Sequence, residues 1–532
     1  MGRKHRHKKR ARAGGAVAPI RKKFQTKAPP SGADAGDKKR RQGQKILTQL
    51  SQDVTSAAPV GALAHSFFQW LIAPVSTDAF FSETFEKKPM YVQRSDKDSA
   101  YFNSIWSKSH VDSILRQHDC EYDVDVTVSV VDEKTGQRVN LAPPEGGKAE
   151  ADDVWKLSSE KGASVRVLRP QQHDKQVWHM LHLLDRYFGM QCGANSYLTP
   201  INTRGFAAHY DDVDVFLLQV EGFKKWQLFR PTNVVEQGEV VEDQFLATHY
   251  SRDYADQELE GMTKLMEVTL GPGDLLYMPR GTVHRGEAVA DPSGKDTCEY
   301  SHHLTVSTAQ QSSWMHFLAL SLPAALQEAA KLDIDFRRTL PRHVFDFMGS
   351  VHEQRIDGRR ELFHEQLSER LTSLANHFPA DAAVDQHRML EQQERGETVE
   401  DLPSKELKLS DRIRVLHKDV ARIAIETPAD ADEPQCVVYH CVGNSRVFND
   451  DSENELRFTL EFAPTLRALL VDTGDHADED ALATMARTNS GEESVEDGWH
   501  LVKELPGEDL DEEDRLILAQ ALYDAGLVYL RH

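Results

Sequence analysis

Two histidines and one carboxylate in this sequence have the types and spacing of a metal-binding set. His209 and Asp211 lie in NSYLTPINTRGFAAHYDDVDVFLLQVEGFKKWQLF (195–229), and His284 ends GDLLYMPRGTVH (273–284). Two imidazoles and one carboxylate on one face of an octahedral ion leave three positions open, which is typical of non-haem Fe(II) sites that bind O2. A structural zinc site normally has four protein ligands, so zinc with these three residues and a water molecule is the alternative.

The His-x-Asp triplet by itself is weak evidence. With 24 histidines and 85 acidic residues in 532, chance predicts about four His-x-Asp/Glu triplets. The chain contains four, which begin at His110, His209, His417 and His476. Only the second leads directly into a continuous apolar run, VFLLQVEG, which predicts a buried strand. Side chains two apart in a strand share a face, so we expect His209 and Asp211 to reach one metal inside a barrel.

A lysine on the next predicted strand indicates a second binding contact. Lys224 follows a glycine turn and has the same strand parity as Trp226 and Leu228. If that face points inward, the ammonium group is buried, and a buried lysine requires a partner. The carboxylate of an acidic co-substrate would satisfy it. Lys225 has the opposite parity, and we expect it to face solvent.

The elements that position these residues are mostly strands. Between 190 and 308, short apolar segments alternate with Gly and Pro turns, which predicts a double-sheet barrel of the cupin type and the α+β class. The segments are VFLLQVEG, KWQLFRP, LMEVTL, LLYMP and HHLTVST. KQVWHMLHLLDRYF (175–188) predicts an amphipathic helix that packs on a sheet. The acidic stretch 236–262 predicts a loop insertion.

Three further regions follow the predicted barrel. From Trp314, two segments with apolar residues every three or four positions predict helices, which we expect to form a homodimer. Residues 391–406 are polar and acidic, as in a linker. Residues 407–532 predict a small module of helices and strands.

Charge is distributed unevenly along the chain. Residues 1–45 contain 16 Lys and Arg and 2 Asp, whereas the whole chain has a net charge of −22. Residues 1–55 lack the apolar residues of a core, so we expect them to be disordered. Their composition favours a nuclear or nucleolar address, or an arm that binds nucleic acid; a solubilising tail is the alternative. The absence of a long apolar run argues against a membrane span, and five scattered cysteines fit a reducing compartment.

At these residues the sequence resembles the JmjC-domain ribosomal oxygenases, which are Fe(II)- and 2-oxoglutarate-dependent protein hydroxylases that use O2. The resemblance covers about residues 60–532 and is densest in the two stretches around His209 and His284. It implies a JmjC barrel with N-terminal helices (56–312), a helical dimerisation region (313–390) and, after the linker, a C-terminal winged-helix-like domain (407–532). Because this last region is strongly acidic, we do not expect it to bind phosphates.

The resemblance also implies roles for individual residues. It implies His209, Asp211 and His284 as iron ligands, and Lys224 as the residue that holds the distal carboxylate of 2-oxoglutarate. Three more residues are implied to line that pocket or the substrate entrance: Asn195, Tyr197 and Ser307.

Two departures from the family pattern lie beside the implied ligands. Ala208 stands where relatives usually have Pro before the first ligand. Arg285, Gly286 and Glu287 follow His284 where relatives often have Gln-Ala. The implied ligands themselves are present, so these departures bear on the shape of the entrance and on the substrate.

The expected substrate is a histidine of a large-subunit ribosomal protein. Methyl-lysine of a histone tail is the alternative, because the same iron chemistry hydroxylates an N-methyl group, which then leaves as formaldehyde. A basic protein segment would suit an acidic cleft, to which we expect Asp211–Asp214 and the loop 236–262 to contribute. A non-enzymatic alternative is a catalytically inactive ribosome-assembly or chromatin factor. The complete set of implied ligands together with Lys224 argues against it.

Overall fold

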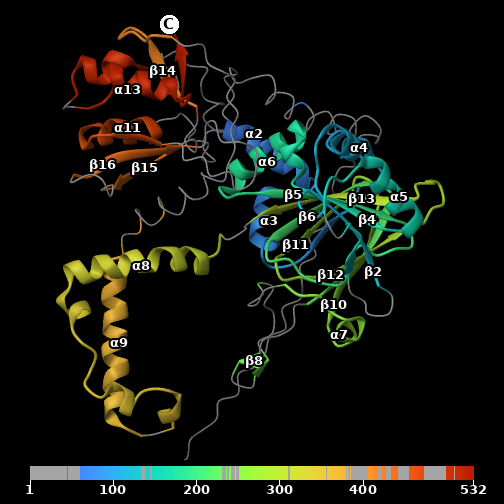
Figure 1. Cartoon of the computed structure of the whole chain (residues 1–532), viewed down its shortest axis with the longest axis horizontal. Coiled ribbons are helices and arrows are strands. Elements are labelled where there is room, and N and C mark those ends of the chain that lie inside the picture. The colour runs from blue at the N-terminus through green and yellow to red at the C-terminus, as the bar shows by residue number, and fades with distance from the viewer. Residues whose placement is uncertain are drawn as a thin grey trace, which may run out of the picture.

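The computed structural model describes residues 60–132, 138–143, 146–230, 251–308, 312–354, 356–378, 405–416, 421–426, 433–440, 455–471, 499–507 and 510–531, with two short strands and a few single positions besides. The basic segment 1–55 and most of the linker 391–406 lie outside these ranges. Figure 1 shows three parts: a barrel with its covering helices, a pair of long helices, and a C-terminal module.

The barrel consists of two antiparallel sheets. The larger sheet has the order β1-β11-β6-β13-β5-β4-β2-β3, and the smaller one has the order β10-β7-β12. The strands of the larger sheet are β1 (Met90–Val92), β2 (Val126–Val131), β3 (Arg138–Asn140), β4 (Ser164–Leu168), β5 (Gly193–Pro200), β6 (Asp214–Glu221), β11 (Leu275–Met278) and β13 (Tyr300–Thr308). Those of the smaller sheet are β7 (Phe223–Phe229), β10 (Lys264–Leu270) and β12 (Val283–Val289). This double-sheet barrel confirms the predicted fold class.

The inner faces of the two sheets pack against each other. Val215 and Leu217 of β6 and Leu276 of β11 lie in one buried cluster with Trp226 and Leu228 of β7. Alternate residues of β6 and β7 therefore point inward, as strand periodicity requires. The segment after His284 was not predicted as a strand. It forms β12, because RGEAV pairs with β7 over its whole length.

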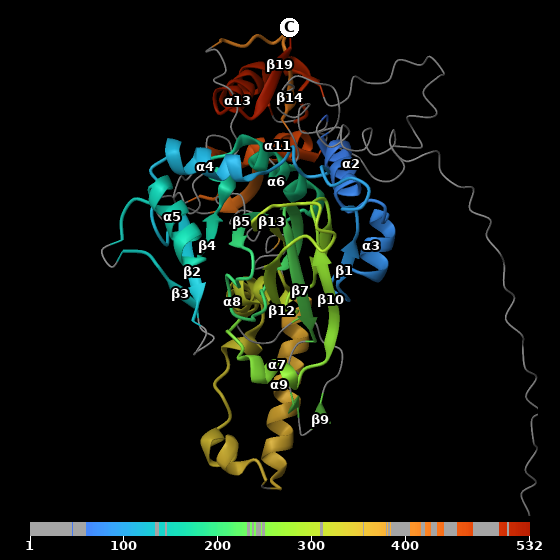
Figure 2. The ribbon, with the colours of Figure 1, turned by 90° about the vertical axis from the view of Figure 1, so that its right-hand side faces the viewer.

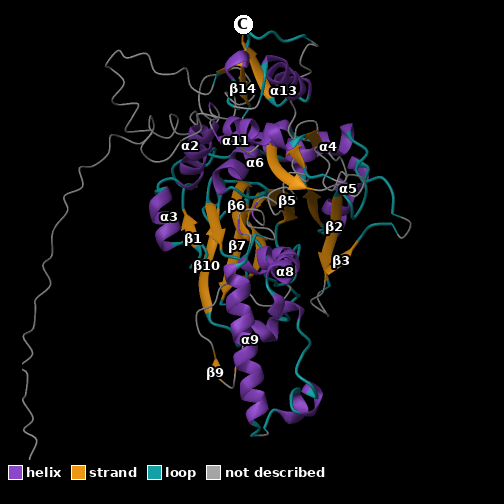
Figure 3. Ribbon diagram, turned by 90° about the vertical axis from the view of Figure 1, so that its left-hand side faces the viewer, coloured by secondary structure: helices purple, strands orange, loops and turns teal. Residues whose placement is uncertain are grey.

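Helices cover the outer face of the larger sheet (Figure 3). They are α2 (Val60–Ile72), α3 (Thr77–Glu83), α4 (Lys108–Gln117), α5 (Ala151–Lys161) and α6 (Lys175–Phe188). Asp174 begins α6 by accepting from two free backbone N–H groups, and Gly189, with a φ of 67°, ends it. Phe68 of α2 packs against Phe216 on the outer side of β6. The large aromatic core thus packs against the outer face of the sheet, and the inner face lines the barrel.

The turn before β11 is fixed by a buried carboxylate. Asp274 is fully buried and accepts hydrogen bonds from the backbone N–H groups of Arg94, Ser95 and Gly271 at 2.6, 2.7 and 2.9 Å. The Tyr91 hydroxyl donates to it at 3.0 Å. These donors satisfy the hydrogen-bonding capacity of the buried carboxylate. It joins β1 to the turn that leads toward His284.

A second buried carboxylate corrects one expectation. Asp214 was expected to add to an acidic cleft, but it is fully buried. It accepts from the Tyr277 hydroxyl at 2.5 Å and from Arg280 at 2.9 Å, and burial raises its pKa to about 6. Asp214 is the first residue of β6 and points to the covered side of the sheet, so it contributes no field to the barrel mouth.

The predicted insertion 236–262 is not entirely loop. Its described part contains the paired strands β8 (Val235–Glu236) and β9 (Glu239–Val240) and the short helix α7 (Asp256–Glu260). Tyr254 donates its backbone N–H to Ala208 at 2.8 Å, and both lie in a buried cluster with Leu259. This end of the insertion is therefore packed beside the His209 segment.

The two remaining parts are smaller. The helices α8 (Trp314–Leu332) and α9 (Gly358–Asn376) stand apart from the barrel (Figure 1). The C-terminal module contains α11 (Ala463–Val471), α13 (Glu512–Asp524) and two three-stranded sheets, of order β18-β14-β19 and β15-β16-β17. Its strands are β14 (Arg412–Val415), β15 (Ala421–Glu426), β16 (Gln435–His440), β17 (Glu455–Phe458), β18 (His500–Leu501) and β19 (Val528–Arg531). Within the described residues, no helix combines the length and apolar character needed to cross a bilayer.

The Asp274 turn yields a stability prediction. Replacing Asp274 by Ala leaves several buried N–H groups without an acceptor, and we expect the free energy of unfolding to fall by about 3 kcal/mol or more. Thermal unfolding followed by tryptophan fluorescence measures this. Asp96→Ala is the control, since its bond to Gln93 is exposed. Equal stability of the two variants would contradict the assigned role.

Candidate active site

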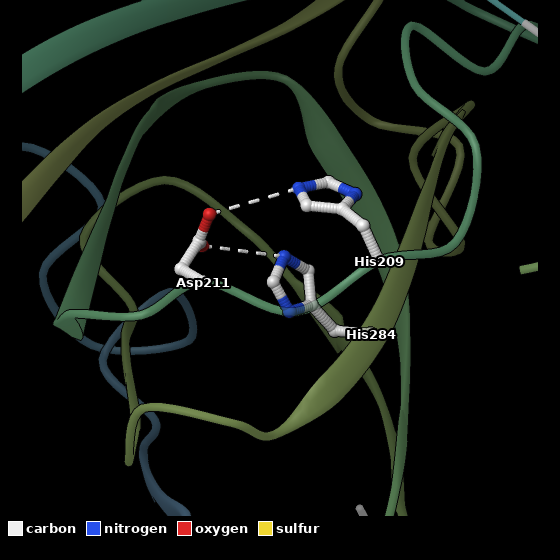
Figure 4. Close-up of side chains that lie close together, drawn as sticks. All are labelled: His209, Asp211 and His284. Carbon is white, nitrogen blue, oxygen red and sulfur yellow. Dashed lines mark ion pairs between the residues drawn. The ribbon is translucent and has the colours of Figure 1, made fainter. Parts of the chain in front are cut away.

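His209, Asp211 and His284 converge at the barrel mouth (Figure 4). Asp211 Oδ1 lies 3.8 Å from His209 Nε2, and Asp211 Oδ2 lies 3.7 Å from His284 Nε2. One ligand atom from each residue lies within 4.8 Å of the others. One ion at about 2.0–2.2 Å from each atom can span the two measured separations. Among the described residues, this is the only cluster of three such side chains.

The backbone fixes the two histidines as a pair. His209 and His284 are antiparallel partners that exchange both N–H···O=C bonds, at 3.1 and 2.8 Å. His209 Nδ1 lies 2.8 Å from the Ala207 carbonyl, and His284 Nδ1 lies 2.9 Å from the Thr282 carbonyl. Carbonyls only accept, so each Nδ1 donates. Both neutral rings then present the Nε2 lone pair to the same point, as metal ligation requires.

Burial keeps at least one ring in the ligating form. Desolvation and, to a smaller extent, the neighbouring His209 lower the pKa of His284 to about 4. A neutral imidazole needs no proton release before it binds a cation. Asp211 lies outside the strand that was expected to carry it. It belongs to the turn before β6, where its carbonyl accepts from Gly281 N–H at 2.8 Å.

An open cavity extends from these three residues into the barrel. Its wall comes from both sheets and from the segment before β6. The lining residues are Tyr197, Phe206, Ala207, His209, Asp211, Val215, Leu217, Lys224, Trp226, His284, Arg285, Gly286, His303 and Thr305. The cavity therefore has a metal-binding set at one end and an apolar wall with a few polar groups, which is the usual character of a small-molecule site.

Lys224 lies inside this cavity, as its strand parity predicts. Its side chain is only 4% exposed, and its nearest polar contact is Thr199 Oγ1 at 3.5 Å. Among the residues that the structure describes, no carboxylate pairs with it. Burial lowers the pKa of Lys224 to about 7. Lys225 instead reaches the solvent side, where it pairs with Glu267 at 2.6 Å.

The remaining implied residues divide between cavity and periphery. Tyr197 lines the cavity, and its ring stacks on His303 at 5.1 Å between centroids. Asn195 and Ser307 share the inner faces of β5 and β13 with this pair, but neither belongs to the cavity wall. Asn195 Oδ1 instead accepts from the Arg169 backbone N–H at 3.4 Å.

Sequence patterns did not indicate two polar contributions to the cavity wall. These are the indole N–H of Trp226 and the imidazole of His303. Among the described residues, neither Trp226 Nε1 nor His303 Nδ1 has a hydrogen-bond partner, although both atoms are buried. Burial lowers the pKa of His303 well below its usual value. Buried polar atoms normally have partners. The sequence did contain an indication of His303. It lies two residues before Thr305 and four before Ser307, so the three side chains share one face of the strand.

The departure after His284 has a structural role. Arg285 turns away from the metal-binding set and donates to Gln227 at 2.6 Å and to Asp256 of α7 at 2.6 Å. Arg204 pairs with the same carboxylate at 3.2 Å. Arg285 therefore ties the segment that contains α7 to the cavity mouth. An arginine at this position adds positive charge there, against the expected acidic cleft.

The one other His-x-Asp triplet that the structure describes, at His110, does not form a comparable site. In α4, Asp112 accepts from Trp155 and Arg116, while His110 stacks on Trp106. The triplets at His417 and His476 lie outside the described residues.

Comparison with known proteins places this geometry in a family. The JmjC domain model matches residues 166–312, which contain all three convergent side chains. The chain is 33% identical to "Ribosomal oxygenase 1" of Danio rerio over 428 residues, covering 76% of this chain and 73% of that protein. The chain belongs to the ribosomal oxygenase family. It is also 30% identical to "Bifunctional lysine-specific demethylase and histidyl-hydroxylase NO66" of Dictyostelium discoideum, over 91% of this chain and 86% of the relative.

A solved structure of an Escherichia coli ribosomal oxygenase, YcfD, in complex with cobalt and 2-oxoglutarate matches 86% of this chain and 99% of its own, at 14% identity and a TM-score of 0.38. The family assignment rests on the sequence relatives, which share 30–33% of their residues with this chain over most of its length. The JmjC region lies in the middle part of this chain, at residues 166–312.

Gly286 yields a prediction about the cavity. A Cβ at this position would lie 2.8 Å from Lys224 Cε and 2.9 Å from the Trp226 ring. Both contacts are closer than real Cβ atoms tolerate, so Gly286→Ala must shift the Lys224 and Trp226 side chains that form this part of the cavity wall. We expect the affinity for 2-oxoglutarate to fall by about tenfold, the equivalent of one weakened charged hydrogen bond.

Anaerobic titration of the Fe(II) protein with 2-oxoglutarate measures this change. Gly261→Ala is the matched control, because its nearest neighbour lies at an ordinary 3.6 Å. An unchanged affinity in Gly286→Ala would show that Lys224 does not hold the co-substrate.

Proposed function

We propose that this protein is an Fe(II)- and 2-oxoglutarate-dependent dioxygenase that hydroxylates a histidine side chain of a large-subunit ribosomal protein. The observation that carries the proposal is one cavity with two His Nε2 atoms and a carboxylate at its mouth and a buried lysine without a counter-ion inside. The family membership and the names of the relatives support the same reading. A catalytically inactive factor has no need of this combination.

Different residues would bind the metal and the co-substrate. His209, Asp211 and His284 would hold the iron on one face and leave the opposite face open. Lys224 would pair with the distal carboxylate of 2-oxoglutarate, which restores its full charge inside the barrel. Iron with 2-oxoglutarate and O2 supplies the oxidising power that inserts oxygen into a substrate C–H bond.

The rest of the wall orients the reactants. The apolar residues of β6 and β7 exclude water from the cavity, and water exclusion strengthens the Lys224 pair. Trp226 Nε1 and His303 Nδ1 are polar atoms beside the proposed co-substrate. Asn195, Tyr197 and Ser307, on neighbouring faces of β5 and β13, would contact the substrate side chain at the entrance.

Cellular context follows from the substrate and from the basic segment. We propose a nuclear and nucleolar location, since residues 1–45 have the composition of such an address. The same segment is suited to contact nucleic acid. Histone tails remain the second substrate class, because one relative is named a lysine-specific demethylase as well as a histidyl-hydroxylase.

Removing one proposed ligand tests the site. We expect His209→Ala to lose substrate-dependent succinate formation by about 10³-fold or more, because two ligands cannot hold iron in the same geometry. Anaerobic addition of Fe(II) and 2-oxoglutarate should also fail to give the metal-to-keto-acid absorption band near roughly 500 nm. His110→Ala, in the triplet of α4, serves as the matched control. Full turnover in His209→Ala would refute the ligand assignment.

Peptide mass spectrometry tests the substrate class. We expect a mass gain of one oxygen on a histidine of a ribosomal-protein peptide, since the cavity with its iron would deliver one oxygen atom. Trimethylated and dimethylated histone peptides are the parallel substrates. Loss of a methyl group from lysine, without any change on histidine, would favour the demethylase instead.

The paired helices support a homodimer. α8 and α9 share only a small buried cluster around Ala325, Ala329 and Leu374, and these helices and the segment between them expose large apolar side chains. The most exposed are Trp314, Met315, Leu332, Ile334, Leu340, Phe345, Val351, Ile356, Leu362 and Leu371, at 54% or more. So many exposed apolar side chains in one region favour a protein–protein interface. A second copy presents the same surface, as a two-fold interface requires.

Charged substitutions on α9 test the dimer. We expect Leu367→Glu with Leu371→Glu to give monomers in sedimentation velocity at micromolar concentration, because a buried carboxylate in an apolar interface is costly. Glu365→Leu, on the same helix, is a control for the change in composition. A monomeric parent protein would disprove the proposal outright.

A further inference from the structure

One face of the C-terminal module differs in charge from the region around it. Residues 407–532 contain 12 Lys and Arg and 28 Asp and Glu. The strands of the β18-β14-β19 sheet (412–415, 500–501 and 528–531) contain three arginines and no acidic residue. A whole-region count therefore hides a basic surface on this sheet.

Strand register places the three arginines on the outer face. Ile413 and Val415 of β14 and Val528 of β19 lie in the module's core, where α13 also packs. The alternate residues must point the other way. These are Arg412 and Arg414 of β14 and Tyr529 and Arg531 of β19. They are exposed or half-buried. Figure 2 shows this sheet at the end of the molecule away from α9.

Two aromatic rings lie among the guanidinium groups. The Arg414 guanidinium lies 5.1 Å from the centre of the Trp499 ring and 5.3 Å from that of Tyr529. Arg531 lies 5.9 Å from the same Trp499 ring. The indole thus lies across the sheet between two cations. Arginine planes and aromatic rings at this spacing form one continuous stacking surface.

The register also sets two arginines directly opposite each other. Arg412 of β14 is the antiparallel partner of Arg531 of β19. Guanidinium groups bind phosphate oxygens in pairs, so two arginines at this register can contact one phosphate.

We propose that this face, formed by Arg412, Arg414, Trp499, Tyr529 and Arg531, binds single-stranded nucleic acid. The arginines would contact phosphates, and the two rings would stack on unpaired bases, as in other sheet surfaces that bind single strands. An acidic peptide would use the charges and leave the rings without a role. A duplex keeps its bases stacked and cannot reach the rings. This site is independent of the barrel and of the basic segment 1–45.

Photo-crosslinking of the full-length protein tests the face and separates it from the basic segment. The probe is a single-stranded 12-mer that contains 5-iodouridine, and peptides are mapped by mass spectrometry. We expect crosslinks at Trp499 or Tyr529. Arg412→Gln with Arg414→Gln should lower their yield by about tenfold through lost phosphate contacts. Crosslinks within residues 1–45 should stay constant and serve as an internal control.

The matched control is Arg457→Gln with Lys503→Gln, which removes two positive charges elsewhere in the module. Thermal unfolding of each variant shows whether the module remains folded. Crosslinks confined to residues 1–45 would overturn the proposal. So would equal competition by poly-glutamate, which would indicate an acidic peptide, or by a duplex of the same length. Hydroxylation of a short peptide should be unchanged in every variant, so failure here leaves the barrel function untouched.

Discussion

The candidate site depends on one antiparallel pair, His209 and His284, which exchange both of their backbone hydrogen bonds. This pair joins the segment before β6 to the start of β12, and so it joins the two sheets at the barrel mouth. Each imidazole then donates Nδ1–H to the carbonyl two residues earlier. The chain thereby fixes the position, tautomer and direction of two ligands before any metal binds. Asp211 needs only the following turn to complete the set.

Lys224 is in a different situation from the two histidines. The fold buries its ammonium group, and no carboxylate among the described residues pairs with it. β7 points it inward, and the barrel removes the water that would solvate its charge. A stable protein would normally pair this group or replace it. The neighbouring polar atoms of Trp226 and His303 are also without partners. Their coincidence in one cavity is best explained by a ligand that is anionic at one end and binds metal at the other.

Sequence periodicity predicted the parts of this site that lie within regular strands. Parity separated Lys224 from Lys225, and the Gly-Pro turns marked the strands of the barrel. Periodicity did not predict the positions of residues that depend on tertiary contacts. Asp211 lies in a turn because His209 pairs with His284, a partner 75 residues away in the sequence. Asp214 looked like part of an acidic mouth, yet its contacts with Tyr277 and Arg280 bury it. No local pattern encodes either contact.

Charge counts along the sequence also do not predict local properties. They sum over residues that the folded chain places on different faces. The C-terminal region is acidic by composition, and this argued against phosphate binding. In the structure, strand register gathers Arg412, Arg414 and Arg531 on one face of a sheet whose strands contain no acidic residue. Electrostatic attraction acts over about 8–10 Å in physiological salt, so a ligand at this face responds to those arginines more than to the net charge. Function in such a module has to be argued face by face.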